Sequence, residues 1–375
     1  MTRTRKIILG TLGVVFGLVV VGVIVLGVVL SHDSPCQPAP ALADHAARMQ
    51  AVVYRCYGSP EVLNVEEVEK PTPNENQVLV KVHAASINPL EWHYMEGKPY
   101  FMRAMSGIGA PEDPALGVDF SGTVEAVGQK VTRFKVGDAV FGGRDGALGQ
   151  YVVVREAGSI VLKPANMTFE QAAAVPVAAV TALQGLRDTG KVHAGQKVLI
   201  NGASGGVGTF AVQIAKSMGA EVTGVCSTRN VELVKSLGAD HVIDYTREDF
   251  TQGTQKYDVI LDAVGSHSLS EYRRVMTPDG IFVIVGGPST DPWLGPMITP
   301  VKAKLLEPFV GQKFQFFLAD INPKDLGVLS DLMQAGKLTP TIDRTYPLSD
   351  IRAAMRYLLA GHARGKVVIE VGDSQ

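Results

Sequence analysis

The stretch that decides the fold is Lys197-Val198-Leu199-Ile200-Asn201-Gly202-Ala203-Ser204-Gly205-Gly206-Val207-Gly208, which a helical pattern follows through Met218. Residues 197–201 have the apolar pattern of a short strand, and residues 221–226 form a second such run after the helix. The helical residues that share one apolar face are Val207, Phe210, Ala211, Ile214 and Met218. The order of strand, glycine-rich turn, amphipathic helix and strand predicts a βαβ unit in a parallel sheet.

The glycine-rich turn indicates what this unit binds. A diphosphate must come close to the backbone N–H groups at a helix N-terminus, and a Cβ atom there would hold it away. Alanine stands at the first glycine position of the usual pattern, so the motif reads A-x-G-x-x-G. In its strand, turn and helix context the motif predicts a dinucleotide site rather than a purely structural turn. The residues expected to contribute are Ala203, Ser204, Gly205, Gly206, Val207 and Gly208.

The end of the second strand indicates which dinucleotide binds. An acidic residue about 20 positions beyond the turn would accept hydrogen bonds from the ribose hydroxyls and would repel a 2′-phosphate. The chain has Ser227, Thr228 and Arg229 at this place. Because a guanidinium donates two parallel hydrogen bonds to a phosphate, the sequence predicts a preference for NADPH. The alternative is that Arg229 is a solvated residue that opens the next helix.

Length, charge and cysteine content limit the remaining classes. A chain of 375 residues can hold two domains with substantial cores. Its formal net charge of -2 argues against nucleic acid as a partner. Cys36, Cys56 and Cys226 have no paired spacing, so the sequence supports neither a disulfide framework nor a cysteine-rich zinc site.

The N-terminal residues differ from the rest of the chain. Residues 7–30 carry no charge and are long enough to cross the hydrocarbon core of a bilayer, which predicts a single-pass transmembrane anchor and a membrane localisation. A secretory signal peptide is the main alternative, because the run follows Arg3, Arg5 and Lys6. Another alternative is that the chain starts at Met49. The positive-inside rule places the enzyme outside, whereas reduced nicotinamide cofactors are kept in the cytoplasm, so the membrane face stays open.

The rest of the chain divides by its patterns. Residues 31–48 are rich in proline, alanine and polar side chains and indicate a linker. Several short β-type runs follow from Met49 without intervening helices, which is typical of a small barrel-like β domain. A helix is expected over residues 169–186, and strands then alternate with helices as in a doubly wound parallel α/β sheet. The apolar segment from Pro288 to Val310 is expected either to line a pocket or to form a helix and loop over the sheet.

Short motifs outside the turn point to a known family. They are Ser86-Ile87-Asn88-Pro89, Gly117-Val118-Asp119-Phe120-Ser121-Gly122, Gly137-Asp138-Ala139-Val140, Ala179-Val180-Thr181-Ala182, Leu237-Gly238-Ala239-Asp240 and Gly365-Lys366-Val367-Val368. With the glycine turn they resemble the medium-chain dehydrogenase/reductase superfamily over Met49 to Val371. The resemblance implies a GroES-like catalytic domain (49–175), a Rossmann cofactor domain (176–320) and a return to the catalytic domain (321–375), preceded by the anchor (1–30) and the linker (31–48).

The resemblance is to the zinc-free branch. Zinc alcohol dehydrogenases of the superfamily carry a cysteine ligand near the position of Pro89 and a histidine ligand at that of Val118, and neither side chain here can bind a metal. The chain is similar to quinone oxidoreductases and enone reductases. The implied reaction is hydride transfer from NADPH to a quinone or an α,β-unsaturated carbonyl, whose own π system accepts the charge and reduces the need for a Lewis acid.

The resemblance also implies roles for single residues. Asn88 matches an asparagine near the nicotinamide that can donate to a developing oxyanion, although an Asn-Pro turn explains it equally well. His93 and Tyr94 lie where the family's substrate pocket begins and are candidate proton donors. Thr181 matches a threonine that contacts the cofactor near its nicotinamide half, and Tyr245 matches a tyrosine that flanks the 2′-phosphate.

The remaining cofactor candidates follow strand ends or flank the final strand. In doubly wound sheets ligands bind at the carboxyl ends of the strands. The candidates are Ala263, Val264, Gly286, Gly287, Arg364 and Lys366, and the last two can also be surface charges. Glu91 and Asp119 are expected to be structural.

Other functions remain open from the sequence. An NAD(P)-dependent alcohol dehydrogenase is one alternative, and a cofactor-binding scaffold or redox sensor without strong turnover is another. The partner in the leading interpretation is a small-molecule quinone or enone, and no metal is expected. The family commonly forms dimers through the cofactor domain, so a homodimer is an option for this chain.

Overall fold

A six-stranded parallel sheet carries the glycine-rich turn. The computed structural model describes residues 3–287 and 291–372, with side chains from Phe16 onward. The strands of this sheet have the order β10-β9-β8-β11-β12-β13. They are β8 (Lys197–Asn201), β9 (Glu221–Cys226), β10 (His241–Asp244), β11 (Tyr257–Asp262), β12 (Met276–Ile284) and β13 (Lys313–Phe316).

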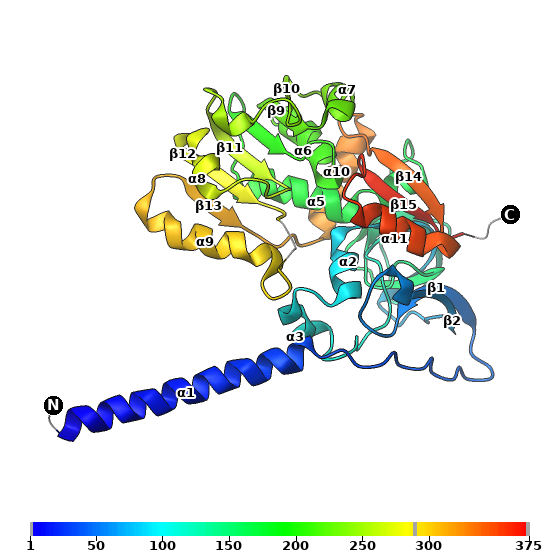
Figure 1. The fold of residues 1–375 in the computed structure, drawn as a ribbon. Coiled ribbons are helices and arrows are strands. Elements are labelled where there is room, and N and C mark those ends of the chain that lie inside the picture. Colours follow the sequence, from blue (N-terminus) through cyan, green and yellow to red (C-terminus); the bar gives the residue numbers. More distant parts are fainter. Residues whose placement is uncertain (1–2, 288–290, 373–375) are drawn as a thin grey trace.

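Helices cover both faces of this sheet (Figure 1). Val198 and Ile200 pack in one core with α6 (Gly206–Ser217), and Leu199, which points the other way, packs in a second core with α8 (Leu269–Arg274). The other covering helices are α5 (Pro176–Gln184), α7 (Val231–Ser236), α10 (Pro323–Gln334) and α9 (Ile298–Leu306). Burial on both faces explains the continuous apolar strands and confirms the predicted Rossmann-type parallel sheet.

A seven-stranded sheet forms the other part of the fold. Its path is β14-β15-β3-β4-β5-β7, and β6 pairs with β3. The strands are β3 (Gln77–Ile87), β4 (Asp119–Val127), β5 (Ala139–Gly143), β6 (Tyr151–Arg155), β7 (Ile160–Leu162), β14 (Ile342–Pro347) and β15 (Lys366–Glu370). The pair β1 (Arg48–Tyr54) and β2 (Leu63–Glu69) lies beside it, and α11 (Ile351–Leu359) packs on the same core.

The end of the chain returns to this sheet. Val367 of β15 pairs with Ile87 of β3 in antiparallel register. The GroES-like half of the predicted α/β fold is therefore confirmed, together with the Rossmann half. The domain boundaries proposed from the sequence, at 175/176 and 320/321, stay a prediction.

The helix expected over residues 169–186 is interrupted. Proline has no N–H group for an intrahelical hydrogen bond, and it is tolerated in the first turn of a helix. The segment accordingly forms α4 (Phe169–Ala173), and a new helix, α5, begins at Pro176. Two short helices that the sequence did not predict, α2 (Pro89–Glu96) and α3 (Arg103–Ser106), follow β3.

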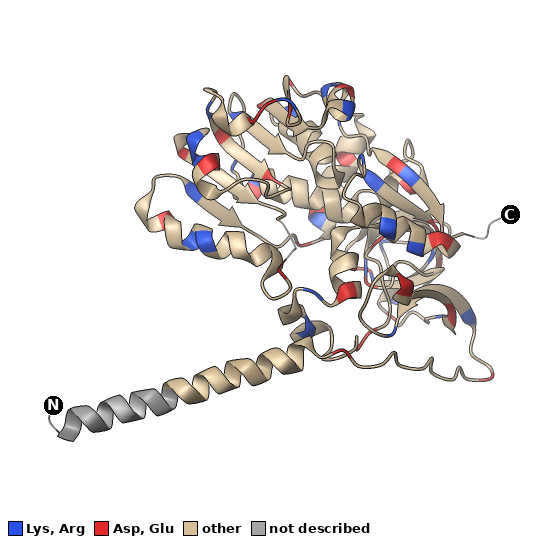
Figure 2. Ribbon diagram, viewed as in Figure 1, with Lys and Arg blue, Asp and Glu red and all other residues tan. Residues whose placement is uncertain are grey.

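The predicted membrane anchor is corrected by the structure. Helix α1 (Arg3–Ser31) projects away from the two sheets, and Figure 2 shows no charged residue in its described part. Within residues 3–287 and 291–372, no helix is both long and apolar enough to cross a membrane. This finding overturns the transmembrane helix and the membrane localisation.

The segment after α1 is attached to the β1 end of the catalytic part. We call residues 32–47 the N-terminal strap. Cys36 forms a disulfide with Cys56, which lies two residues beyond β1, with a Cα–Cα distance of 4.5 Å. The spacing of the cysteines gave no support for a disulfide, and this one forms because the strap folds back along the residues after β1. The backbone N–H of Gln37 donates to the carbonyl of Arg55 beside the disulfide, at 3.1 Å.

The core between α6 and the parallel sheet provides a stability prediction. Phe210 is fully buried there, so Phe210→Ala should lower the free energy of unfolding by about 3–5 kcal/mol. Urea unfolding followed by circular dichroism measures this change. Val136→Ala, at a side chain that is 62% exposed, is the control and should change it by less than about 0.5 kcal/mol. Equal effects of the two substitutions would contradict the described packing of α6.

Candidate active site

The carboxyl ends of the parallel strands meet at one edge of the sheet. Asn201 of β8 is level with Val225 of β9 and with Asp262 of β11. The helix that follows β8, α6, lies on one face of the parallel sheet. The helix that follows β11, α8, lies on the opposite face. In this topology a crevice opens between β8 and β11, and ligands of doubly wound sheets bind at such a point.

The turn between β8 and α6 brings bare backbone to this crevice. Gly202 has a φ of +85°, a conformation that side chains disfavour. A Cβ atom on Gly208 would overlap the carbonyl oxygen of Gly202, so glycine is needed for the close packing of the turn on the helix. At Gly205 an added Cβ would meet no atom closer than 3.4 Å, so the space above this backbone is free. With the N-terminus of α6 beginning at Gly206, the turn fits a diphosphate.

The loop before β15 closes one side of the crevice. The backbone N–H of Gly365 donates to the carbonyl of Ser204 at 2.9 Å, and Gly205 and Gly365 form a parallel bridge. The Arg229 guanidinium donates through Nη2 to the carbonyl of His362 at 2.8 Å. Both parts of the fold therefore contribute to the walls of the cofactor crevice.

A buried amide lies on the adenosine side of the crevice. Asn230 donates through Nδ2 to the hydroxyl oxygens of Ser204 at 2.9 Å and of Ser227 at 3.2 Å. Its Oδ1 atom is buried and has no hydrogen-bond partner in the described part of the chain. An unpaired buried acceptor is costly, and a ribose hydroxyl would supply the missing donor. Asn230 was not among the residues predicted from the sequence, although it directly follows Ser227, Thr228 and Arg229.

The acidic residue that is missing from the end of β9 is present at the end of β10. Asp244 is level with Cys226 and accepts a hydrogen bond from the Thr228 hydroxyl at 2.5 Å. This hydrogen bond is the first cause that lowers the pKa of Asp244. The Thr228 hydroxyl is therefore already hydrogen-bonded to Asp244. Tyr245, the residue after Asp244, is 58% exposed. Asp244 was not predicted, because the acidic residue was expected only at the end of β9, although its neighbour Tyr245 was a candidate.

The other side of the crevice follows β11 and β12. The backbone N–H of Val264 donates to Asp262 Oδ1 at 3.1 Å, and that of Gly286 donates to the Asp262 carbonyl at 3.1 Å. A Cβ on Gly286 would lie 2.5 Å from the carbonyl oxygen of Ala263, so these two loops are in close contact, and Gly287 continues the second. The buried Asp262 carboxylate, which also accepts from Asn201, was missed as an organising residue.

A buried cluster of polar side chains surrounds Asn88. Lys366 donates from Nζ to Asn88 Oδ1 and pairs with Asp119 Oδ2 at 3.1 Å. Asn88 donates through Nδ2 to the same Asp119 oxygen at 3.0 Å and through its backbone to Glu91 Oε2 at 2.8 Å. Lys366 is thus a buried ion-pair partner rather than a surface charge, whereas Arg364, two residues earlier, is exposed. The cluster holds the Asn88 side chain in a single orientation.

Zinc does not fit the donor set of this cluster. The ammonium of Lys366 already lies among the oxygen atoms of Asn88 and Asp119 and would repel a second cation. Val118 offers only its backbone N–H, which donates to Glu91 Oε1 at 3.1 Å. No group of three or more His, Cys, Asp or Glu side chains could hold a metal ion in residues 3–287 and 291–372.

The two proton-donor candidates have different surroundings. His93 Nδ1 lies 2.9 Å from the carbonyl oxygen of Lys98, and burial lowers the pKa of the imidazole. Because a carbonyl only accepts hydrogen bonds, Nδ1 carries the proton, and Nε2 of the neutral ring is left without one. Burial raises the pKa of the Tyr94 phenol, which therefore stays protonated at neutral pH.

Thr181 lies on α5, beside the cluster. Its hydroxyl donates to the carbonyl of Val177 at 2.7 Å, within its own helix. The backbone N–H of Val177 in turn donates to Asp119 Oδ1 at 2.8 Å. The start of α5 is thus fastened to the carboxylate that pairs with Lys366, and this places Thr181 near the cluster.

The segment from Pro288 to Val310, which was expected to line a pocket or to cover the sheet, contacts the residues that follow α2. The backbone N–H of Tyr100 donates to the carbonyl of Pro292 at 2.7 Å, and its ring packs edge-on against Trp293. Residues 288–290 of this segment lie outside the described residues. A hollow of about 660 Å³ also exists, but it is lined by residues such as Lys256 and Thr277, near the amino ends of β11 and β12. It is therefore at the opposite edge from the crevice.

Comparison with known proteins agrees with this geometry. Residues 74–165 match the family of the alcohol dehydrogenase GroES-like domain, and residues 237–369 match that of the zinc-binding dehydrogenase. A 2-methylene-furan-3-one reductase from Solanum lycopersicum is 34% identical over 86% of this chain and 79% of its own length. An NADPH-dependent alkenal/one oxidoreductase, chloroplastic, from Arabidopsis thaliana is 34% identical with the same two coverages, 86% and 79%. The solved structure of the quinone oxidoreductase from Coxiella burnetii superposes with a TM-score of 0.74 at 30% identity, covering 87% of this chain and 100% of that one.

The Glu91 carboxyl provides a pH prediction. Burial, and then the charge of Asp119, raise its pKa from 4.5 to about 7. Since the folded state binds the proton more tightly, stability is highest below about pH 4.5 for this group and falls as the pH rises to about 7. Glu91→Gln should remove this loss, measured as the change in unfolding free energy between pH 5 and pH 8. Glu232→Gln, on an exposed helix position, is the control, and a Glu91→Gln protein with the wild-type pH dependence would contradict the assignment.

Proposed function

The chain belongs to the medium-chain dehydrogenase/reductase superfamily and is an NAD(P)H oxidoreductase, and on this premise we propose that it reduces a quinone or an α,β-unsaturated carbonyl with NADPH, without zinc. The observation that carries the proposal is the Lys366 ammonium in the buried cluster around Asn88. The relatives in tomato, Arabidopsis and Coxiella are named for enone, alkenal and quinone substrates, which supports the substrate class.

The residues of the crevice would hold the cofactor. The backbone of Ser204–Gly208 would bind the diphosphate, and Asn230 and Ser227 would bind the adenosine ribose. Bound NADPH would supply the hydride, and the conjugated acceptor would spread the resulting charge over its own π system. Thr181, Ala263, Val264, Gly286 and Gly287 would line the nicotinamide side.

On the substrate side, the protein positions the acceptor and delivers a proton. Asn88 is held by Lys366, Asp119 and Glu91, which supports a role in ordering the nicotinamide end of the crevice. Tyr94 is the proposed proton donor, because its phenol stays protonated, whereas the neutral His93 ring has no proton on Nε2. His93 would then donate a proton to the substrate only in its protonated form.

The preference for NADPH over NADH rests on the cationic rim of the crevice. Arg229 is exposed and braced by the His362 carbonyl, so its remaining donors can reach a 2′-phosphate. Arg364 and Tyr245 are exposed in the flanking loops. The negative charge of Asp244 opposes phosphate binding, and its ion pair with Arg247 at 3.3 Å reduces this repulsion. A homodimer through the cofactor part stays a prediction.

The activity is tested with the full-length chain and NADPH. Absorbance at the nicotinamide band is followed with a panel of quinones, conjugated enones and simple alcohols, the last with NADP⁺. We expect NADPH consumption with quinones or enones that a metal chelator does not inhibit. Chelator-sensitive alcohol oxidation would instead identify a zinc alcohol dehydrogenase, and tight NADPH binding without turnover would identify a cofactor-binding scaffold.

Reversal of one charge tests the NADPH preference. Arg229→Glu should raise the dissociation constant for NADPH by about 10- to 100-fold, because two charge-assisted hydrogen bonds are lost, and should change that for NADH much less. Quenching of protein fluorescence measures both constants. Lys235→Glu, on the neighbouring helix α7, makes the same change of charge away from the crevice and is the matched control. Equal losses for both nucleotides would remove Arg229 from the phosphate site.

A further inference from the structure

A fully buried arginine joins the N-terminal strap to the loops beyond α2. The Arg103 side chain is 1% exposed, and its guanidinium lies over the rings of Tyr57 and Tyr100. Its Nε donates to the carbonyl of Gly97 at 2.8 Å, at the C-terminal end of α2. The opposite side of the guanidinium therefore needs acceptors from elsewhere, because an unpaired buried charge is very costly.

Those acceptors come from the strap and the end of α1. Arg103 Nη1 donates to the carbonyls of Leu30 at 3.1 Å and His32 at 3.0 Å. Nη2 pairs with Asp33 Oδ1 at 2.8 Å, and Asp33 itself is 64% exposed. The Asp33 carboxylate that balances this buried cation thus lies in a segment outside both sheets.

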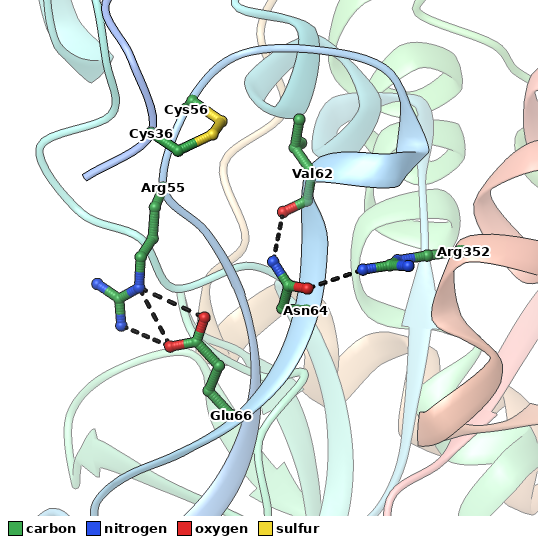
Figure 3. The surroundings of a disulfide bond; sticks show 7 residues. All are labelled: Cys36, Arg55, Cys56, Val62, Asn64, Glu66 and Arg352. Carbon is green, nitrogen blue, oxygen red and sulfur yellow. Dashed lines mark hydrogen bonds and ion pairs between the residues drawn. A yellow bond between two sulfur atoms is a disulfide. The ribbon is translucent and has the colours of Figure 1, made fainter. Parts of the chain in front are cut away.

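Further contacts hold the strap in position. Just beyond Asp33, the backbone N–H of Ser34 donates to the carbonyl of Gly109 at 2.8 Å. The Cys36–Cys56 disulfide follows, beside the bidentate pair of Arg55 and Glu66 (Figure 3). The strap is therefore attached both to residues 97–109, which we call the wall segment, and to the residues that follow β1.

The wall segment borders the proposed substrate side. The Lys98 carbonyl accepts from His93 Nδ1, and Tyr100 contacts Pro292 and Trp293 of the facing loop. Tyr57, which stacks on Arg103, donates from its hydroxyl to the Gly107 carbonyl at 2.7 Å. The wall segment that Arg103 holds therefore contacts both the ring of His93, through Lys98, and the loop of Pro292 and Trp293, through Tyr100.

We propose that Arg103 is a positioning residue for substrate binding, and that the N-terminal strap completes its contacts and so keeps the wall segment closed on the substrate side. The proposal rests on the proposed function in taking the substrate side to be next to His93 and Tyr94. If the strap and the end of α1 left the wall segment, the Arg103 cation would lose Asp33 and the carbonyls of His32 and Leu30 while still buried between two rings. Opening of the strap and opening of the wall segment are therefore coupled.

Single substitutions of similar size separate positioning from general stability. Asp33→Asn removes the carboxylate that balances Arg103, whereas Asp44→Asn removes the same charge from an exposed strap residue and is the matched control. Arg103→Lys keeps the charge but cannot reach Gly97 and the strap together, because an ammonium lacks the planar fork of donors. A double variant, Cys36→Ser with Cys56→Ser, releases the strap without changing Arg103.

Hydrogen exchange of the full-length chain measures the opening of the wall segment and does not require catalytic turnover. In Asp33→Asn and in the double cysteine variant we expect amides of residues 97–109 to exchange about three- to tenfold faster, with unchanged exchange in β8 and α6. Arg103→Lys should show a larger increase. The Asp44→Asn protein should match the wild type. Unchanged exchange of residues 97–109 in all three variants would overturn the proposal.

Kinetics with 1,4-naphthoquinone and NADPH provide the second readout. We expect the KM for the quinone to rise about three- to tenfold in Asp33→Asn, while the dissociation constant for NADPH stays within twofold of the wild-type value. A parallel loss of NADPH binding and of thermal stability would indicate a merely structural role and contradict the proposal. If the wild type reduces no quinone or enone, the proposed function fails, and the exchange experiment still tests the coupling of strap and wall.

Discussion

The close packing between Gly208 and the carbonyl of Gly202 is the constraint on which the cofactor site depends. Because no side chain fits at Gly208, α6 begins directly above the end of β8, with its free N–H groups at the carboxyl edge of the sheet. The strands β9, β11 and β12 end at the same edge through their parallel register. The turn, the ribose-side amide of Asn230 and the loops after β11 and β12 therefore surround one crevice.

The two-residue segment Gly365–Lys366 joins this crevice to the other sheet. Gly365 donates to the Ser204 carbonyl of the turn, and Lys366, the next residue, neutralises the buried Asp119. The same ammonium orders Asn88, at the end of β3. The return of the chain to the first sheet thus has two effects, since it completes a wall of the crevice and supplies the cation that pairs with the buried carboxylate of Asp119.

The sequence predicted what depends on local periodicity. The continuous apolar run of Val198, Leu199 and Ile200 and the 3.6-residue spacing in α6 are encoded within a few residues, so the βαβ unit could be predicted. Pairings between distant segments could not. Asp244 reaches Thr228 only because β10 adds beside β9, and Lys366 meets Asp119 at a separation of 247 residues.

The N-terminal segment shows the same limit. Its composition indicated an anchor and a linker, yet the position of Cys36 opposite Cys56 depends on how the strap folds back, which no local pattern encodes. The apolar composition of residues 7–30 was also insufficient to predict a transmembrane anchor. In residues 3–287 and 291–372, no helix is long and apolar enough to cross a membrane. The role of Arg103 follows only from the contacts that Leu30, His32 and Asp33 make with it.

A crystal structure of the full-length chain grown with saturating NADPH tests the central claim most directly. The account predicts that the diphosphate lies over the backbone of Gly205–Val207, with the adenosine ribose at Asn230 and the nicotinamide toward the cluster of Asn88, Asp119 and Lys366. Density for the nucleotide at another edge of the sheet, or an empty crevice under these conditions, would contradict it.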